Sequence, residues 1–416
     1  MKTTKDKFTL GLIITAVLFG ATTFILFTIR WMVDGQVFGD FAETLSYCLV
    51  KNPYNGETNN IMTIYPPFAF LPLILFALIA KKPISGYING SITLTELCKE
   101  PLYILSFMLF HIICTGIILY VAIKITKFRG IKLAALITIT LCFAPLLFTF
   151  FRANNIVLAI VFALLFFWLY DSEKRWQREL ANLFLACCIG IKIYPALLLL
   201  YFIKDRRFMD MLKTFLYALG ILFVPFILID GGFANIGELW NNFSQFSGEA
   251  DRALSATNIS IDSLASKISY LLLGTGTSTL QSIIGQVLKY GLILSTVFCM
   301  IVNKNSKLKI QSIILVLLTY NLFQSISYAY VFGYLIIPIL FYIANIDEFS
   351  TFNKFFYGIC FVLMGLPTYA LFDWFILPQI VAIILAAKCV YDITSEFIKQ
   401  IKSNKTQKTE EKNSNI

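Results

Sequence analysis

The sequence predicts an all-α membrane protein, a polytopic bundle of transmembrane helices, and three observations support this fold class. Of the 416 residues, 58% are hydrophobic and only 14% are charged, whereas soluble domains carry about 25% charged residues. The mean hydropathy is +0.76. Apolar runs near the length of about 20 residues that a spanning helix needs recur along the chain. A soluble globular protein is therefore excluded.

The first apolar run covers residues 8–29 and follows Lys2, Lys5 and Lys7. A signal peptide also begins with basic residues, but its apolar core is shorter, about 7–15 residues, and it ends in small residues. This run ends in bulky residues before Arg30. The sequence therefore predicts a retained first helix whose N-terminus is cytoplasmic.

Basic clusters between the later apolar runs predict the topology, because cytoplasmic loops are enriched in Lys and Arg. The later runs lie at 64–80, 102–123, 133–151, 156–170, 180–203, 211–229, 282–302, 310–325, 327–343, 355–372 and 374–391. The clusters lie at 124–132, 174–178, 204–213 and 304–309, and the C-terminal tail is also rich in lysine. We expect all of them, and both termini, to face the cytoplasm. The net charge of +10 then reflects membrane orientation rather than nucleic-acid binding.

This topology requires two departures from simple alternation of the runs. Residues 64–80 contain three prolines, which disfavour a straight helix, so we expect them to lie in or dip into the outer leaflet. Residues 180–203 are predicted to form a hairpin of two short helices, broken at 192–195, because Pro195 disfavours helical geometry in the residue before it. About 12 crossings result if each arm of the hairpin counts as one.

Residues 1–398 are predicted to form a single transmembrane domain with outer loops at 30–101 and 230–281. Residues 399–416 are polar and lysine-rich, so composition predicts a disordered cytoplasmic tail. Half of the 24 carboxylates fall in the outer segments. We therefore expect chemistry on the outer face of the plasma or inner membrane.

Cysteine and histidine usage gives no support for a metal or redox site. The nine cysteines include no Cys-x-x-Cys pair, and His111 is the one histidine. His111 is either a hydrogen-bonded interior residue, which we favour, or an intramembrane polar site. Cys48 and Cys98 share the first outer loop, and the sequence leaves their pairing open. We predict no metal and no cofactor.

Residues 40–51 in the first outer loop predict an amphipathic helix at the membrane surface. Phe41 and Leu45 belong to an apolar face with helical spacing, whereas Asp40, Glu43 and Tyr47 occupy another face. The segment is too short to span the membrane. Asp40 fits a helix N-cap, and a general base at this position is compatible with that role.

Several short motifs follow one another along the chain: Asp40, Asn52-Pro53-Tyr54, Tyr65-Pro66-Pro67, Ile191-Lys192-Ile193-Tyr194-Pro195 and Asn258-Ile259-Ser260, with Lys267 downstream. Their order resembles glycosyltransferase family 87, the membrane glycosyltransferases of the GT-C fold that use polyprenyl-phosphate sugars. The family often has Arg followed by Gly-Gln and Asn between the third and fourth spans. This chain departs from that pattern with Arg152-Ala153-Asn154-Asn155.

The resemblance implies transfer of a sugar, mannose or similar, from a polyprenyl-phosphate carrier to an acceptor hydroxyl on the outer face. The acceptor is a glycolipid, a glycan or a protein. Asp40 matches the catalytic carboxylate and would act as general base. Lys192 and Arg152 are expected to bind the donor phosphate, although either cation could instead snorkel to lipid headgroups.

Five further residues are expected to contact substrate by the same resemblance: Glu43, Tyr65, Tyr194, Asn258 and Ser260. Loop packing is the alternative role for the last two, and Glu43 could simply face solvent. Lys81, Lys82 and Lys289 are weaker phosphate candidates. Two other functions remain open, a polymerase or ligase of the O-antigen type and a transporter or flippase for lipid-linked sugars.

Overall fold

The structure is a computed structural model of the chain, and it describes residues 2–31, 39–56, 62–247, 258–275, 279–303, 308–366 and 376–414. Within these ranges the chain is helical and contains no β-strand; one isolated β-bridge pairs Asn258 with Tyr328. The all-α class predicted from the sequence is confirmed.

The helices follow one another with short connections. The first group is α1 (Lys2–Trp31), α2 (Gly39–Leu49), α3 (Ile74–Ile79), α4 (Lys81–Ile88), α5 (Leu94–Leu97), α6 (Pro101–Thr126), α7 (Ile131–Leu141), α8 (Ala144–Arg152) and α9 (Ile156–Leu169). The second group is α10 (Arg175–Ile191), α11 (Tyr201–Lys204), α12 (Phe208–Phe223), α13 (Asn235–Ser247), α14 (Ile261–Leu273), α15 (Thr279–Val302), α16 (Lys309–Phe323), α17 (Ile336–Ala344), α18 (Thr351–Gly365) and α19 (Leu377–Ser414). Short 3₁₀ helices are η1 (Pro67–Ala69), η2 (Leu71–Leu73), η3 (Tyr194–Leu200), η4 (Val224–Leu228), η5 (Gly232–Ala234), η8 (Ala329–Leu335) and η9 (Ile346–Glu348).

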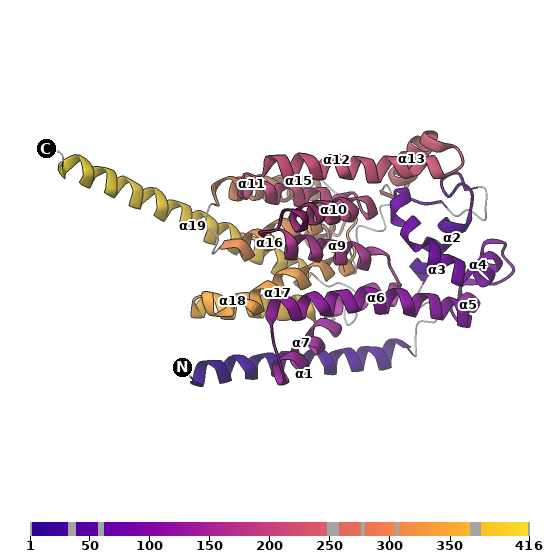
Figure 1. The fold of residues 1–416 in the computed structure, drawn as a ribbon, viewed down its shortest axis with the longest axis horizontal. Helices are drawn as coiled ribbons and strands as arrows, with labels where there is room; N and C mark the ends of the chain where they lie inside the picture. The colour runs from indigo at the N-terminus through magenta and orange to yellow at the C-terminus, as the bar shows by residue number, and fades with distance from the viewer. Residues whose placement is uncertain are drawn as a thin grey trace.

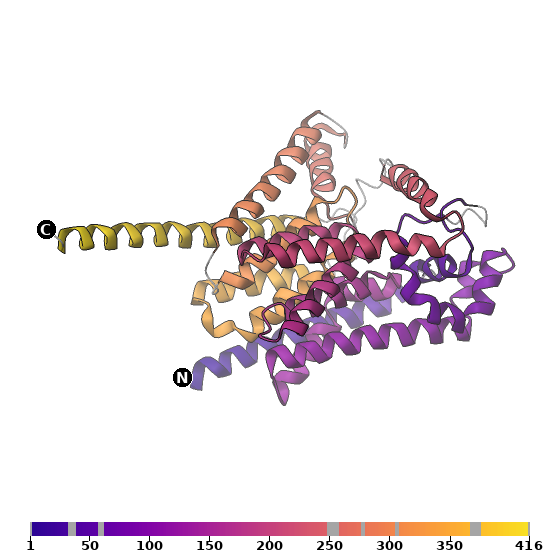
Figure 2. The same ribbon diagram turned by 45° about the horizontal axis from the view of Figure 1, so that its top comes forward.

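The bundle has two distinct ends (Figures 1 and 2). Helices α2, α3, α4, α5 and α13 gather at one end, which we call the α2 end, whereas both chain termini lie at the other, which we call the terminal end. Helix α11 lies toward the terminal end, and the Arg207 side chain just after it donates to the carbonyl of Tyr170 after α9. The basic clusters at 174–178 and 204–213 therefore adjoin one another.

The predicted hairpin between residues 180 and 203 is present. Helix α10 ends at Ile191, and Lys192 has an extended backbone with φ −137° and ψ 127°. The chain then returns through η3 and α11, so that Tyr201 packs against Tyr170 with ring centroids 4.9 Å apart. Both ends of the hairpin thus lie at the same end of the bundle, and its tip lies at the other.

The proline-rich segment at 64–80 is also bent. The helical stretch Pro67–Ile79 meets α4 at an angle of 110°. Such a path fits either a broken span or a re-entrant segment, so the expectation that these residues do not cross the membrane stays a prediction.

The predicted count of 12 crossings is not confirmed. The described residues include five helices long and apolar enough to cross a membrane, or up to seven if each bent pair forms one span. The apolar helices α9 and α16 have 14 and 15 residues, which is short of the roughly 20 that span a bilayer. They are buried on nearly every side, so their apolar sequences reflect a position inside the bundle as much as a path through lipid.

Helix α19 continues through the polar C-terminal tail, where composition predicts disorder. It runs to Ser414 and projects beyond the bundle at the terminal end (Figure 1). Lys, Gln and Glu, which dominate this segment, have high helix propensities, so local preference allows the helix to extend past the packed region.

Candidate active site

Helix α2 is packed between neighbouring segments of the bundle rather than lying on the surface of the protein. Phe41 packs against Phe110 on α6 with stacked rings 5.4 Å apart, and Leu45 is fully buried. Tyr47, expected on the polar face, is buried as well and meets the ring of Phe70. Residues 67–88 cover the face of α2 that carries Tyr47. The accessible face of the helix is therefore limited to the side that carries Asp40 and Glu43.

Asp40 lies within the first turn of α2, and its carboxylate is held by side chains rather than acting as the expected N-cap. Arg152 donates from Nε to Oδ2 at 2.9 Å and from Nη2 to Oδ1 at 2.8 Å. Asn154 donates from Nδ2 to Oδ2 at 2.7 Å. The bidentate geometry fixes the plane of the carboxylate. The Asp40 side chain keeps 19% of its surface exposed, so a substrate can reach it.

A tight turn after α8 delivers both donors to Asp40. Ala153 has φ +55° and ends the helix in the left-handed region, a conformation that is uncommon for residues other than Gly. Asn154 uses its Oδ1 to accept from the backbone N–H of Ile156 at the start of α9. Its Nδ2 is thereby directed at Asp40.

Two tyrosines that the sequence analysis did not single out cover Arg152. The guanidinium carbon lies 5.5 Å from the ring centroid of Tyr328 and 6.0 Å from that of Tyr330. Cation–π contacts of this kind stabilise a guanidinium in a fixed orientation. The only signal in the sequence is a pair of tyrosines two residues apart in an otherwise apolar region.

Lys192 lies at the tip of the α10 hairpin and faces Tyr65. Its Nζ is 3.8 Å from the centroid of the Tyr65 ring, and the Tyr65 side chain also lies near Asp40 and Asn154. Tyr65 therefore joins the lysine to the group around Asp40. The motifs around residues 40, 65, 152 and 192 thus meet in one place.

Glu43 lies one turn after Asp40 on the open face of α2. The surrounding protein desolvates its carboxylate, and the negative charge of Asp40 repels it. Both effects raise the pKa of Glu43, whereas the positive charge of Arg152 lowers it. Glu43 therefore takes up a proton at a higher pH than an ordinary glutamate does.

Asn258 and Ser260 are engaged by the protein backbone. The Asn258 Oδ1 accepts from the N–H groups of Ser260 and Ser327, each at 3.1 Å. The Ser260 hydroxyl donates to the carbonyl of Ser325 and caps α14. This arrangement fixes the strand-like segment that precedes Tyr328, so the contribution visible here is to hold the tyrosines over Arg152.

Other candidates have structural partners or lie apart. Tyr194 follows Lys192 at the hairpin tip and approaches Phe243 of α13, with ring centroids 6.4 Å apart. Lys289 forms an ion pair with Asp262. Lys81 and Lys82 are exposed at the start of α4.

Asn52-Pro53-Tyr54 connects the first loop to α13. Asn52 donates to the Asn235 side chain at 2.9 Å, and the Asn242 side chain donates to the carbonyl of Tyr54. The Tyr54 ring stacks on Phe226. This motif thus supports the α2 end without contacting Asp40.

The remaining candidates from the sequence are one histidine and two cysteines. His111 is buried, and its Nδ1 lies 3.1 Å from the carbonyl of Phe107, which agrees with an interior histidine. Cys48 and Cys98 are free thiols. Among the described residues, no group of three His, Cys, Asp or Glu side chains could hold a metal ion.

The profile of glycosyltransferase family 87 matches residues 63–324. The chain belongs to glycosyltransferase family 87. It matches no curated protein and no solved structure. The matched region of this family 87 glycosyltransferase includes Tyr65, Arg152, Lys192 and Asn258, whereas Asp40 precedes it. Membership therefore establishes a glycosyltransferase with membrane character.

Proposed function

We propose that this family 87 glycosyltransferase moves a sugar, mannose or similar, from a polyprenyl monophosphate to an acceptor hydroxyl of a glycolipid, glycan or protein. The observation that supports it most is the position of Asp40, a partly exposed carboxylate held by Arg152 and Asn154. The hairpin tip with Lys192 adds a second cation to the same place.

Asp40 is the proposed general base. It takes the proton of the acceptor hydroxyl as the oxygen bonds to the anomeric carbon. The bond from that carbon to the phosphate oxygen breaks, and its electron pair stays on the polyprenyl phosphate. A single displacement of this kind inverts the anomeric centre. The Asp40 Oδ1 accepts one hydrogen bond and Oδ2 accepts two, so Oδ1 is the oxygen with room for the acceptor.

Arg152 links the base to the leaving group. While Asp40 is ionised, the guanidinium neutralises it through two hydrogen bonds. Proton transfer removes the negative charge of Asp40 and creates charge on the departing phosphate. Arg152 is then free to stabilise the phosphate, and Lys192 provides the second positive charge. Stabilisation of developing charge by fixed donors is usually a large part of enzymatic rate enhancement.

The proposed orientation places the α2 end on the outer face of the plasma or inner membrane. The basic clusters at 174–178 and 204–213 adjoin one another away from the hairpin tip, and Lys and Arg are enriched on the cytoplasmic side. Both termini then face the cytoplasm.

Asp40→Asn tests the proposal. This substitution removes the base but keeps a side chain of the same size, so we expect transfer from a labelled polyprenyl-phosphate sugar to fall by about 10²–10⁴-fold with normal expression. Asp230→Asn is the matched control, because Asp230 is an exposed carboxylate elsewhere in the outer loops, and it should retain activity. Near-normal transfer by Asp40→Asn would remove Asp40 as the base.

The two alternative functions predict different results in the same assay. A polymerase or ligase of the O-antigen type would depend on residues 230–281 and not on Asp40. A transporter would move the lipid-linked sugar across vesicle membranes without forming a glycosidic bond.

A further inference from the structure

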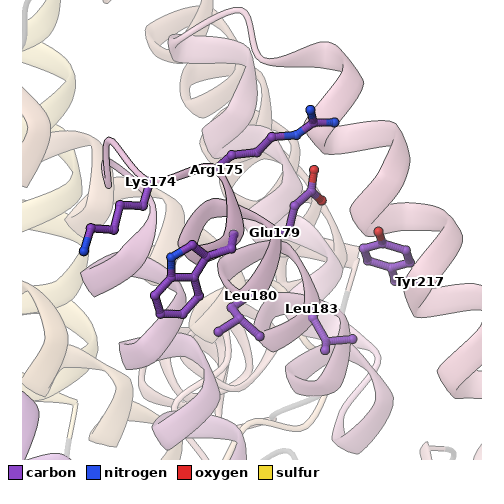
Figure 3. A pocket seen from close by; sticks show the side chains of 7 residues that line it. Lys174, Arg175, Glu179, Leu180, Leu183 and Tyr217 are labelled. Atoms are coloured by element: carbon purple, nitrogen blue, oxygen red, sulfur yellow. The ribbon is translucent and has the colours of Figure 1, made fainter.

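A cavity of about 970 Å³ lies between α10 and α12, far from Asp40 (Figure 3). It is lined by Lys174, Arg175, Trp176, Glu179, Leu180, Leu183 and Tyr217. Six lining residues lie just before α10 or in its first half, and Tyr217 belongs to α12. Lys192 follows the other end of α10. The 17 residues of α10 extend about 25 Å at 1.5 Å per residue. The charged end of the cavity, at Lys174 and Arg175, is thus separated from Lys192 by most of the thickness of a bilayer core, about 30 Å.

The lining changes in character along α10. The helix starts with the cations Lys174 and Arg175, continues with Trp176, and then presents Leu180 and Leu183 one and two turns further on. Figure 3 shows Arg175 extending toward the side of α12 that carries Tyr217, and the leucines lying below. A lipid has the same sequence of chemistry, with a charged headgroup, an interfacial backbone and apolar chains.

The aromatic and aliphatic members of the lining are exposed. Trp176 is 59% exposed, Leu183 is 40% exposed, and Tyr217 is 40% exposed. Trp and Tyr are enriched where membrane meets water. The residues are therefore placed to contact lipid at the interface and just beneath it.

The charge of the cavity is positive. Glu179 is neutralised by Lys213, with Nζ and Oε1 2.5 Å apart. Within the part of the chain that the structure describes, no ion pair is formed by Lys174 or Arg175. Two cations are thus free to meet an anion at the mouth of an apolar cavity.

We propose that this cavity binds an anionic glycerophospholipid from the leaflet at the terminal end. Arg175, which extends toward α12, binds the phosphate, and Lys174 adds positive charge from the other side of the start of α10. Trp176 contacts the glycerol region, and Leu180, Leu183 and Tyr217 contact an acyl chain. The site is independent of the proposed sugar transfer, because it lies at the opposite end of α10 from Lys192.

Brominated lipids test the proposal through Trp176. The full chain in detergent is titrated with phosphatidylglycerol or phosphatidylcholine brominated on the acyl chains, which quench a nearby indole. Subtracting the signal of Trp176→Phe isolates this residue. At about 1 kcal/mol for each cation, we expect an affinity about 30-fold higher for phosphatidylglycerol. Equal quenching by the two lipids would overturn the proposal.

Charge variants identify the residues involved. Lys174→Gln with Arg175→Gln should abolish the preference for phosphatidylglycerol. Lys127→Gln with Arg129→Gln is the control, since it removes the same charge from exposed positions on another connection, and it should keep the preference. An unchanged preference in the first variant contradicts the site, as does displacement of the brominated lipid by soluble glycerol phosphate at equal concentration, which would indicate a plain phosphate site.

Discussion

Arg152 donates two hydrogen bonds of 2.8 and 2.9 Å to the carboxylate of Asp40, although the two residues are 112 positions apart in the sequence. The guanidinium carbon lies 5.5 Å from the ring centroid of Tyr328 and 6.0 Å from that of Tyr330. The carboxylate is thus positioned by a residue that is itself positioned by aromatic rings.

Arg152→Lys should reduce kcat/KM by about 100-fold, because a lysine keeps the charge but cannot form the bidentate contact or contact both rings equally. Rates of transfer and the thermal midpoint should be measured together. Full activity in this variant would show that sugar transfer does not depend on the bidentate contact between Arg152 and Asp40.

Tyr65→Leu should raise the KM for the lipid-linked donor about fivefold, since a cation–π contact contributes about 1 kcal/mol and the Lys192 Nζ lies 3.8 Å from this ring. Tyr65→Phe keeps the ring and loses only the hydroxyl, so it should leave the donor KM unchanged. Equal KM values for the two variants would argue against a role for the ring.

Glu43→Gln should alter the acid side of the pH–rate profile. The pKa of Glu43 is raised, so in the native protein Glu43 becomes neutral at a higher pH than an ordinary glutamate as the solution is acidified. The negative charge of ionised Glu43 favours protonation of Asp40, so the loss of this charge slows sugar transfer. The variant lacks this charge at every pH, and we expect a lower plateau without the step that Glu43 causes. An identical profile shape would contradict the coupling.

Gly190→Ala should destabilise the protein and impair transfer. A Cβ at Gly190 would collide with Ile221 of α12 and lie 2.9 Å from Phe68 of η1, and overpacking costs about 1–3 kcal/mol. Since Phe68 follows Tyr65-Pro66-Pro67, the shift should reach Tyr65.

Gly220→Ala is the matched control for that change, because a Cβ there meets no atom within 4 Å and Ala favours a helix over Gly. Thermal midpoints in detergent should fall for the first variant and hold or rise for the second. A similar fall in both would exclude the proposed close contact.

Part of the site could be predicted from the sequence because its residues belong to local motifs. Asp40 opens an amphipathic segment, and Lys192 precedes Tyr194-Pro195 at a helix break, so each carries a signal within a few residues. Tyr328 and Tyr330 carry no such signal. Their proximity to Asp40 depends on how separate helices pack side by side, which apolar periodicity does not encode.

The sequence by itself determined the membrane class, the helical content, the basic clusters and the break in the α10 hairpin, because hydropathy, charge and proline act locally. Only the tertiary structure decided that Arg152 pairs with Asp40, that the Asn258 segment supports Tyr328, and that short apolar helices such as α9 and α16 are buried within the bundle. The physical reason is that an apolar helix surface can pack equally well against lipid or against protein, so its sequence does not specify its neighbours. Directional hydrogen bonds between distant segments, in contrast, form only once the helices are packed.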